Sequence, residues 1–381
     1  MLIYFVILVI TIFLYRMDKH SRKFALLVML LLFLITAFRD ISIGIDTNNY
    51  VSKYKFRYNE YTSEFLFNNT YNLIHTIGGS PQLWLFFVSL LIYIPYTYVI
   101  CKYSKVPMMS VLIFLTSSSL FFFDGMNGIR QWIASGVILL ALVLRSYGKV
   151  KIPVLLVFCA AAFHLSSIIA FPFLFITFFT MGRKLAYAII VSIAILGILI
   201  SHFDTSGIFD FYGYLIEGYE GEGMEKLNAY SRYEDMENTT NWKYYVFNIL
   251  PLSFMCLAAY VEVAKDKATA VGAPRKKQHK LLTKALSTEK ENAHYLYIVF
   301  LTGVVLLDLL LTTIAYGHRL AFCILTSQLI CLPNGYVYGG KKQRLFINLV
   351  LCFFMLWYMY YVYRTNGSRI GSTVPYKFFW E

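Results

Sequence analysis

Long apolar runs recur along the whole of this 381-residue chain, and they limit its fold more than any other feature. A helix needs roughly 20 mostly apolar residues to cross the ~30 Å hydrocarbon core of a bilayer. Only 14% of the residues are charged, against about a quarter in a typical soluble domain. The 33 Phe and 31 Tyr suit aromatic belts at two membrane interfaces. We therefore predict an all-α fold, a polytopic transmembrane helical bundle that forms one integral membrane domain over residues 1–381.

The apolar runs divide into about twelve expected spans with basic loops on one side. The expected spans are 2–15, 24–38, 82–100, 107–123, 129–145, 152–163, 165–180, 185–202, 243–263, 293–315, 319–338 and 345–363. With the amino terminus outside the cytoplasm, the inside loops hold 22 of the 34 Lys and Arg residues, and 15 of the 21 acidic residues lie outside. Because basic residues concentrate in cytoplasmic loops, we expect both termini outside the cytoplasm.

Three long loops separate the expected spans. Residues 39–81 and 203–242 are expected outside the cytoplasm, and the second loop is acidic and rich in tyrosine. Residues 264–292 are basic and poor in aromatic side chains, which is typical of a solvated cytoplasmic linker. The basic residues that give the net charge of +13 therefore lie mainly where the positive-inside rule places them, and we expect no nucleic-acid partner.

The sequence lacks the motifs of nucleotide-driven and zinc-dependent enzymes. It contains no P-loop, no G-x-G-x-x-G after a strand, no H-E-x-x-H and no G-x-S-x-G. The six cysteines are scattered through apolar segments without a C-x-x-C pair, so they are typical of small core residues. We expect neither a metal nor a cofactor.

Polar side chains gather where expected spans end on the outside face; such side chains are costly in a bilayer and therefore often mark a functional site. Arg130 follows a Gly- and Asn-rich bend into a helix, which favours an anion site; a structural pair with Asp124 is the alternative. His164 lies between two expected spans and precedes Ser166 and Ser167. It is a candidate general base or hydroxyl-binding group, against the simpler role of a buried structural histidine.

Further charged residues lie on the same expected face. Arg39 ends an expected span and Asp46 follows it, although snorkelling and local capping are the simpler roles for these two. His318 and Arg319 lie together at another outside turn. Guanidinium groups bind a diphosphate well, so Arg319 and the loop residue Arg232 are candidate clamps. Arg232 would also offset the carboxylates around it.

Asp308 is the one acidic residue deep in an expected span, which favours a transporter or a flippase of lipid-linked sugars. A hydrogen bond between helices is the alternative role for its carboxyl group. Transporters place their functional polar residues near the midplane, in broken helices and repeats, and the sequence shows no repeat. A membrane acyltransferase would also use a histidine and arginines, but the sequence has no signature of an acyl-donor route.

Three segments, in order and spacing, resemble the EpsG family, which contains Wzy-type O-antigen and exopolysaccharide polymerases. The segments are 39–50 (RDISIGIDTNNY), 127–134 (NGIRQWIA) and 163–166 (FHLS). In the later half, Tyr316, Arg319 and the long outside loop extend the resemblance. The chain departs from the family pattern at His164, where relatives often carry two adjacent histidines.

This resemblance implies a membrane glycosyltransferase that transfers a growing glycan from undecaprenyl diphosphate to the next lipid-linked repeat. The reaction would take place on the periplasmic face of the bacterial inner membrane and would need no nucleotide. The implied partners are the lipid-linked donor and acceptor, membrane lipids, a chain-length regulator and a flippase.

The resemblance also suggests roles for the candidate residues. Four arginines would bind the diphosphate, whose developing charge must be stabilised: Arg39, Arg130, Arg232 and Arg319. Asp46 or His164 would take the proton of the acceptor hydroxyl. The sugars would be contacted by four further residues: Tyr50, Gln131, Tyr233 and His318.

Overall fold

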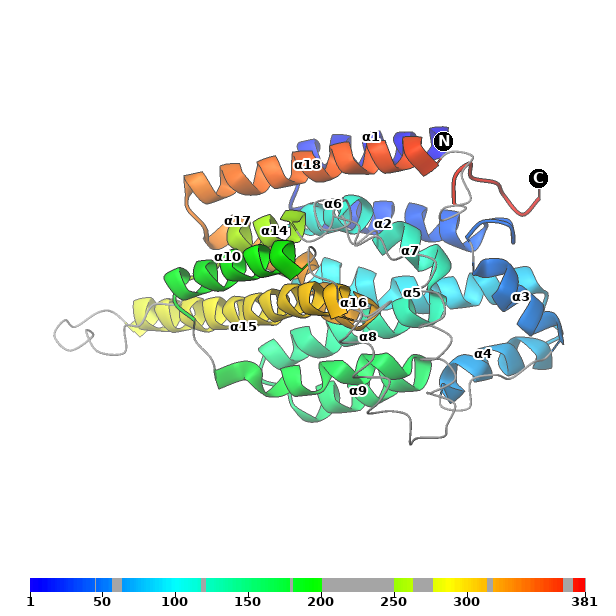
Figure 1. The fold of residues 1–381 in the computed structure, drawn as a ribbon, viewed down its shortest axis with the longest axis horizontal. Helices are drawn as coiled ribbons and strands as arrows, with labels where there is room; N and C mark the ends of the chain where they lie inside the picture. Colours follow the sequence, from blue (N-terminus) through cyan, green and yellow to red (C-terminus); the bar gives the residue numbers. More distant parts are fainter. Residues whose placement is uncertain are drawn as a thin grey trace.

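The computed structural model describes residues 1–44, 46–56, 64–117, 121–178, 181–200, 250–262, 277–313, 318–365 and 373–380. Within these residues the chain is helical, and the one β-type pairing is an isolated bridge between Arg39 and Phe378. The prediction of an all-α fold is therefore confirmed for this part of the chain. The longer helices lie side by side, with their axes along the long dimension of the molecule (Figure 1).

Most of the described helices coincide with the expected spans, but α3 and α4 do not. The described helical segments are α1 (Leu2–Met17), α2 (Arg22–Ala37), α3 (Thr47–Phe56), α4 (Phe65–Thr76), α5 (Pro81–Tyr103), α6 (Pro107–Thr116), α7 (Phe121–Asn127), α8 (Ile129–Ser146), α9 (Lys151–Phe163), η1 (Leu165–Ala170), η2 (Pro172–Phe178), α10 (Arg183–Ile200), α14 (Leu250–Ala259), α15 (Lys277–Thr313), α16 (His318–Leu325), α17 (Gln328–Tyr338) and α18 (Lys341–Thr365).

Four helical segments among the described residues are long and apolar enough to cross a membrane. They are Pro81–Tyr103, Ile129–Ser146, Leu320–Tyr338 and Lys341–Thr365. Shorter apolar helices accompany them, α1, α6, α9 and α14 included. Helix length and composition thus agree with a membrane protein. The number of about twelve spans and the side on which the termini lie remain predictions.

Three of the expected spans are broken. The stretch 107–123 divides into α6 and α7, and 319–338 divides into α16 and α17. The stretch 165–180 forms the two 3₁₀ helices η1 and η2, where the Ser167 hydroxyl donates a hydrogen bond to the His164 carbonyl and Pro172 begins η2. Such local hydrogen bonds and a proline compete with regular α-helix.

Helix α15 extends further toward the amino terminus than expected. It begins at Lys277, inside the stretch 264–292 that was expected to be a solvated linker. Residues 277–292 are rich in Lys, Leu and Glu, which favour helix even where the chain is polar. The described part of this stretch is therefore helical.

Segment 39–81 contains two short helices, α3 and α4, instead of an irregular loop. The Tyr54 ring stacks on His75 at 4.0 Å, and its hydroxyl donates to the Gly79 carbonyl at 2.6 Å. Trp84, near the start of α5, donates from Nε1 to the Thr70 hydroxyl at 2.9 Å. These aromatic contacts fix α3 and α4 against one end of the bundle.

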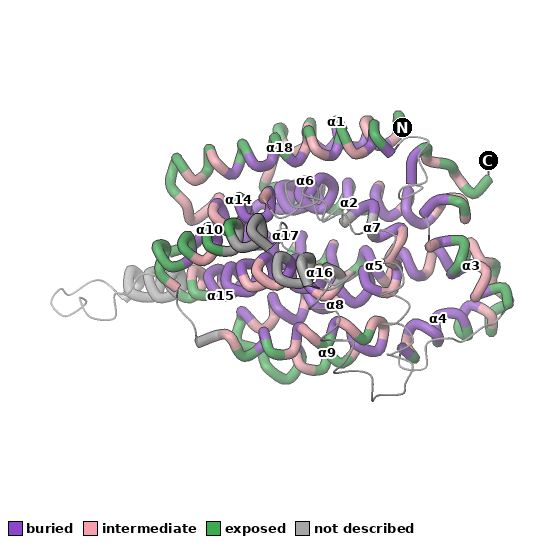
Figure 2. Tube along the Cα trace, viewed as in Figure 1, coloured by how far each residue is buried: buried purple, intermediate pink, exposed green. Residues whose placement is uncertain are grey.

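The core of the bundle lies around α6, in which all ten residues are buried. Figure 2 shows buried residues concentrated in the interior helices and exposed ones along α1 and α18. The exposed residues of α18 include Leu345, Leu349 and Leu356. Exposed leucines on an outer helix suit contact with lipid tails.

The two ends of the bundle differ in their side chains. At one end the basic loops meet: Lys19 Nζ lies 2.8 Å from the Tyr336 hydroxyl, and Lys105 Nζ lies 3.0 Å from Glu289 Oε1. Both marked chain ends lie toward the other end of the bundle, the end at which α3 and α4 also lie (Figure 1). There the Asp40 N–H donates to the Lys377 carbonyl at 2.9 Å, which ties the carboxyl-terminal segment to the end of α2.

The packing of α5 against α8 depends on Gly136. A Cβ at this position would lie 2.8 Å from Pro95 Cγ and 3.1 Å from Tyr96 Cε2, so these two side chains of α5 pack directly against the backbone of α8. We expect Gly136→Leu to lower the unfolding free energy by roughly 1–3 kcal/mol through overpacking. The melting temperature of the purified protein in detergent measures this effect.

Gly182→Leu is the matched control, because nothing lies within 4 Å of a Cβ built at Gly182 and its backbone conformation is ordinary. Its melting temperature should stay at the wild-type value. Equal melting temperatures for the two variants would contradict the close approach of α5 and α8.

Candidate functional site

The structure brings together a carboxylate and two basic side chains from three separate segments, at the end where α3 and α4 lie. Glu64 precedes α4, Arg130 lies in the first turn of α8, and His164 directly follows α9. Arg130 Nη1 donates to Glu64 Oε2, and His164 Nδ1 lies 2.9 Å from Glu64 Oε1. The Leu165 N–H also donates to Oε1, at 3.2 Å. We call Glu64, Arg130 and His164 the Glu64 cluster.

The local backbone explains how the helix ends meet at this point. At His164 the chain leaves α9 in an extended conformation, with φ −154° and ψ 110°, while its N–H still donates to the Ala160 carbonyl. Gly128 is the residue before α8 and offers no side-chain cap, so the first N–H groups of α8 keep their positive field. Arg130 adds a full positive charge in that first turn.

The Glu64 cluster is mostly shielded from solvent. The side chains of Glu64, Arg130 and His164 are 7%, 19% and 20% exposed. Burial alone would raise the pKa of the Glu64 carboxyl, but the hydrogen bond with His164 and the charge of Arg130 outweigh it and lower the pKa to about 2. Glu64 is therefore a carboxylate at neutral pH, and its stabilising effect is lost only as the pH falls from about 4.5 toward about 2.

Aromatic side chains hold the Arg130 guanidinium in place. Its Nε donates to the Tyr50 hydroxyl at 3.3 Å, and its central carbon lies 5.9 Å from the ring centroids of both Tyr50 and Phe67. Cation–π contacts of this kind help to fix the orientation of the planar guanidinium group. Tyr50, expected to bind sugar, thus contacts Arg130 directly.

Arg39 lies apart from the Glu64 cluster. It is 1% exposed; its Nη1 donates to the Thr36 carbonyl, and its Nη2 donates to the Met126 carbonyl at 3.3 Å. The Thr47 hydroxyl donates to the same Met126 carbonyl at 3.1 Å. Arg39 is thus buried rather than snorkelling, and its contacts support the turn between α7 and α8 that precedes Arg130.

The remaining candidates differ in how far the structure places them. Asp46 lies one turn before Tyr50, whose N–H donates to the Asp46 carbonyl at 3.0 Å. Gln131 follows Arg130 in α8 and is buried. His318 and Arg319 begin α16, but their side chains, like those of Asp124 and Asp308, lie outside the described part of the structure.

The acidic loop also lies outside the described residues, with the candidates Arg232 and Tyr233 in it, and so does Tyr316. The sequence-based expectations for these residues therefore stay predictions. The alternative pair between Arg130 and Asp124 also stays a prediction, because the Asp124 side chain lies outside the described part of the structure. What the structure does show is a different carboxylate, Glu64, bound to Arg130.

Sequence reasoning missed Glu64. It belongs to no recognised motif and lies in the middle of a long loop, 66 residues before Arg130 and 100 before His164. One signal was present: Glu64 directly precedes the amphipathic stretch 65–76 (FLFNNTYNLIHT), which forms α4. If the loop contains a helix, the residue directly before that helix has a fixed position.

The arrangement can perform acid–base chemistry beside an anion site. A carboxylate at Nδ1 favours the tautomer with its proton on Nδ1, which leaves Nε2 of His164 as the basic nitrogen. Arg130 places a guanidinium next to that imidazole through the shared carboxylate. Among the described residues no group of three or more His, Cys, Asp or Glu side chains could hold a metal ion.

Comparison with known protein families gives a match over most of the chain. The family profile described as the EpsG family matches residues 22–378, a range that includes all three members of the Glu64 cluster. No curated protein and no solved structure matches the chain. Since the match covers nearly the whole sequence, the chain belongs to the EpsG family.

Proposed function

We propose that this protein is a polysaccharide polymerase. It transfers a growing glycan from undecaprenyl diphosphate to the next lipid-linked repeat, on the periplasmic face of the bacterial inner membrane. Membership of the EpsG family and the apolar helices support a membrane polysaccharide polymerase of this general kind. The observation that carries the specific chemistry is the Glu64 cluster, which pairs a basic imidazole with a guanidinium at one end of the bundle.

In the proposed reaction His164 is the general base. Its Nε2 takes the proton from the acceptor hydroxyl as that oxygen forms the new bond to the anomeric carbon of the donor sugar. The bond between this carbon and the diphosphate oxygen breaks, and the diphosphate leaves with the bonding electrons. Glu64 is a positioning residue, since it holds the His164 ring and stabilises the imidazolium that forms.

Arg130 provides the second requirement of the reaction, because it stabilises the negative charge that grows on the departing diphosphate. A guanidinium carries five N–H donors in a rigid fork, so one group can serve both a carboxylate and a phosphate. Tyr50 and Phe67 hold the plane of the guanidinium in one orientation. A preorganised donor of this kind needs no reorientation as the bond breaks.

The other candidate residues complete the proposal. Arg319 and Arg232 are proposed as further diphosphate ligands, and Gln131, Tyr233 and His318 as sugar contacts. Asp46, close to Tyr50 in the chain, is the alternative base. The contacts of Arg39 favour a supporting role for it over direct contact with the diphosphate.

The first prediction tests Arg130. Arg130→Lys keeps the charge but loses the planar fork, so we expect polymerisation to slow by about 10²–10³ at normal protein abundance. Glycan ladders formed by purified protein from lipid-linked repeats measure the rate. Arg145→Lys is the matched control on the same helix, because Arg145 donates to the Leu174 carbonyl far from the Glu64 cluster; a wild-type rate for Arg130→Lys would contradict the proposed role.

The second prediction tests the base. His164→Ala should slow polymerisation by about 10²–10⁴ because the base is lost, while the donor still binds because Arg130 keeps its bond to Glu64. The same assay, together with binding of labelled donor, measures both quantities. His20→Ala serves as the control, since His20 contacts the Lys105 carbonyl at the opposite end of the bundle. A normal rate for His164→Ala with an inactive Asp46→Asn would transfer the role to Asp46.

The third prediction concerns the side of the membrane on which the Glu64 cluster lies. Thr76 ends α4, Lys149 lies between α8 and α9, and both residues are exposed. Glu64, just before α4, binds Arg130 at the start of α8, whereas Lys149 follows the end of α8, about 24 Å along the helix from Arg130. With the exposed Cys352 replaced, we expect Thr76→Cys to react with a membrane-impermeant maleimide in spheroplasts. Lys149→Cys should react only after lysis. The reverse pattern would place the site in the cytoplasm and contradict the proposed function.

A further inference from the structure

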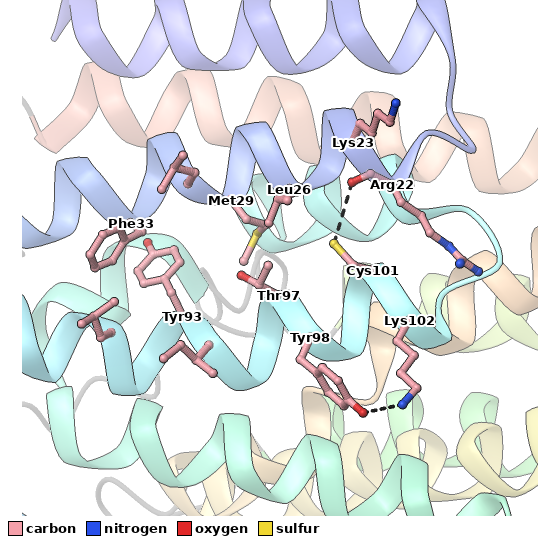
Figure 3. Close-up of a pocket in the computed structure, with 13 residues that line it drawn as sticks. Arg22, Lys23, Leu26, Met29, Phe33, Tyr93, Thr97, Tyr98, Cys101 and Lys102 are labelled. Atoms are coloured by element: carbon pink, nitrogen blue, oxygen red, sulfur yellow. Dashed lines mark hydrogen bonds between the residues drawn. The ribbon is translucent and has the colours of Figure 1, made fainter.

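A long groove lies between α2 and α5, apart from the Glu64 cluster. It has a volume of about 650 Å³, within the range of sites that hold a small molecule or a lipid chain. Its walls are almost wholly apolar and include Leu26, Met29, Phe33 and Ile94. Figure 3 shows Leu26, Met29 and Phe33 of α2 beside Tyr93 and Thr97 of α5. We call this feature the α2–α5 groove.

Cations mark one end of the α2–α5 groove. Arg22 and Lys23 begin α2, and Lys102 lies in the last turn of α5, so these three basic residues lie at the end of the groove opposite Phe33 (Figure 3). Lys102 Nζ lies 2.5 Å from the hydroxyl of Tyr98, which also lines the groove. Within the described part of the chain none of the three cations forms an ion pair with a carboxylate. This end of the groove therefore carries a net positive charge beside an apolar wall.

The length of the apolar wall matches one leaflet of a bilayer. Arg22 and Phe33 are eleven residues apart in α2, which corresponds to about 16 Å of helix. Half of the ~30 Å hydrocarbon core is about 15 Å. An acyl chain whose head group contacts Arg22 and Lys102 would therefore end near Phe33, at the depth of the bilayer midplane.

We propose that the α2–α5 groove binds one anionic phospholipid from the leaflet on the basic side of the protein. Its phosphate contacts Arg22, Lys23 and Lys102, and an acyl chain lies along Met29, Phe33 and Ile94. Basic pockets between membrane helices recognise anionic head groups in this way. The inference needs only the membrane location and is independent of the proposed polymerase reaction.

The position of the cations separates this lipid from the proposed substrate. Arg22 lies at one end of α2, and the other end of that helix leads through Arg39 to Met126, next to the segment that carries Arg130. The sixteen residues of α2 span about 24 Å. A lipid phosphate at Arg22 is therefore far from the Glu64 cluster, where the departing diphosphate is proposed to lie.

Native mass spectrometry of the full-length protein in detergent tests the proposal, with phosphatidylglycerol and phosphatidylcholine of identical acyl chains as probes. We expect one phosphatidylglycerol to bind at least ten-fold more tightly than phosphatidylcholine. Arg22→Gln with Lys102→Gln removes two charges and should weaken phosphatidylglycerol binding by roughly thirty-fold. Both residues are exposed, so this variant should fold normally.

Two further variants sharpen the result. Lys341→Gln with Lys342→Gln removes two exposed cations at the start of α18 that do not line the groove, and it should bind phosphatidylglycerol as wild type does. Thr97→Trp places a large ring in the groove and should weaken the binding of both lipids. Equal binding of the two lipids, or unchanged binding by the Arg22 and Lys102 variant, would overturn the proposal. So would displacement of phosphatidylglycerol by a lower concentration of undecaprenyl phosphate, which would make the isoprenoid the occupant.

Discussion

The carboxylate of Glu64 is the group on which the arrangement at this end of the bundle depends. It binds Arg130 at the start of α8, His164 after the end of α9, and the Leu165 N–H at the start of η1. Burying one charge is costly, and removing one partner of a buried pair typically costs about 3–5 kcal/mol, because the other charge is left uncompensated. Each member therefore fixes the position of the others, and three segments far apart in the sequence are held together at one site.

The surrounding structure keeps Glu64 where both partners reach it. The aromatic contacts of Tyr54 and Trp84 fix α3 and α4 on the bundle, and Glu64 directly precedes α4. On the other side, Arg39 and Thr47 hold the Met126 carbonyl just before α8 begins. The bundle thus supplies a rigid frame, and its short outer helices supply the carboxylate, which is the arrangement that a preorganised site needs.

Sequence patterns predicted much of this fold, because long apolar runs indicate membrane-spanning helices directly. They placed α1, α2, α5, α8, α9 and α18 to within a few residues, and they singled out Arg130 and His164 at the ends of helices. They failed for α3 and α4, whose apolar faces are short and packed on aromatic side chains rather than lipid. Glu64 was missed for the same reason, since only the fold brings it to residues 66 and 100 positions away.

The central claim is that Glu64 acts on the reaction through His164, and a double-mutant cycle on the polymerisation rate tests it most directly. Glu64→Gln keeps a side chain of the same shape without the charge, and His164→Ala removes the proposed base. If Glu64 orients the imidazole, adding Glu64→Gln to His164→Ala should slow the reaction far less than it slows the wild type, with a coupling energy of about 1–3 kcal/mol. Two effects that simply multiply in the double variant would show that the residues act independently and would contradict the account.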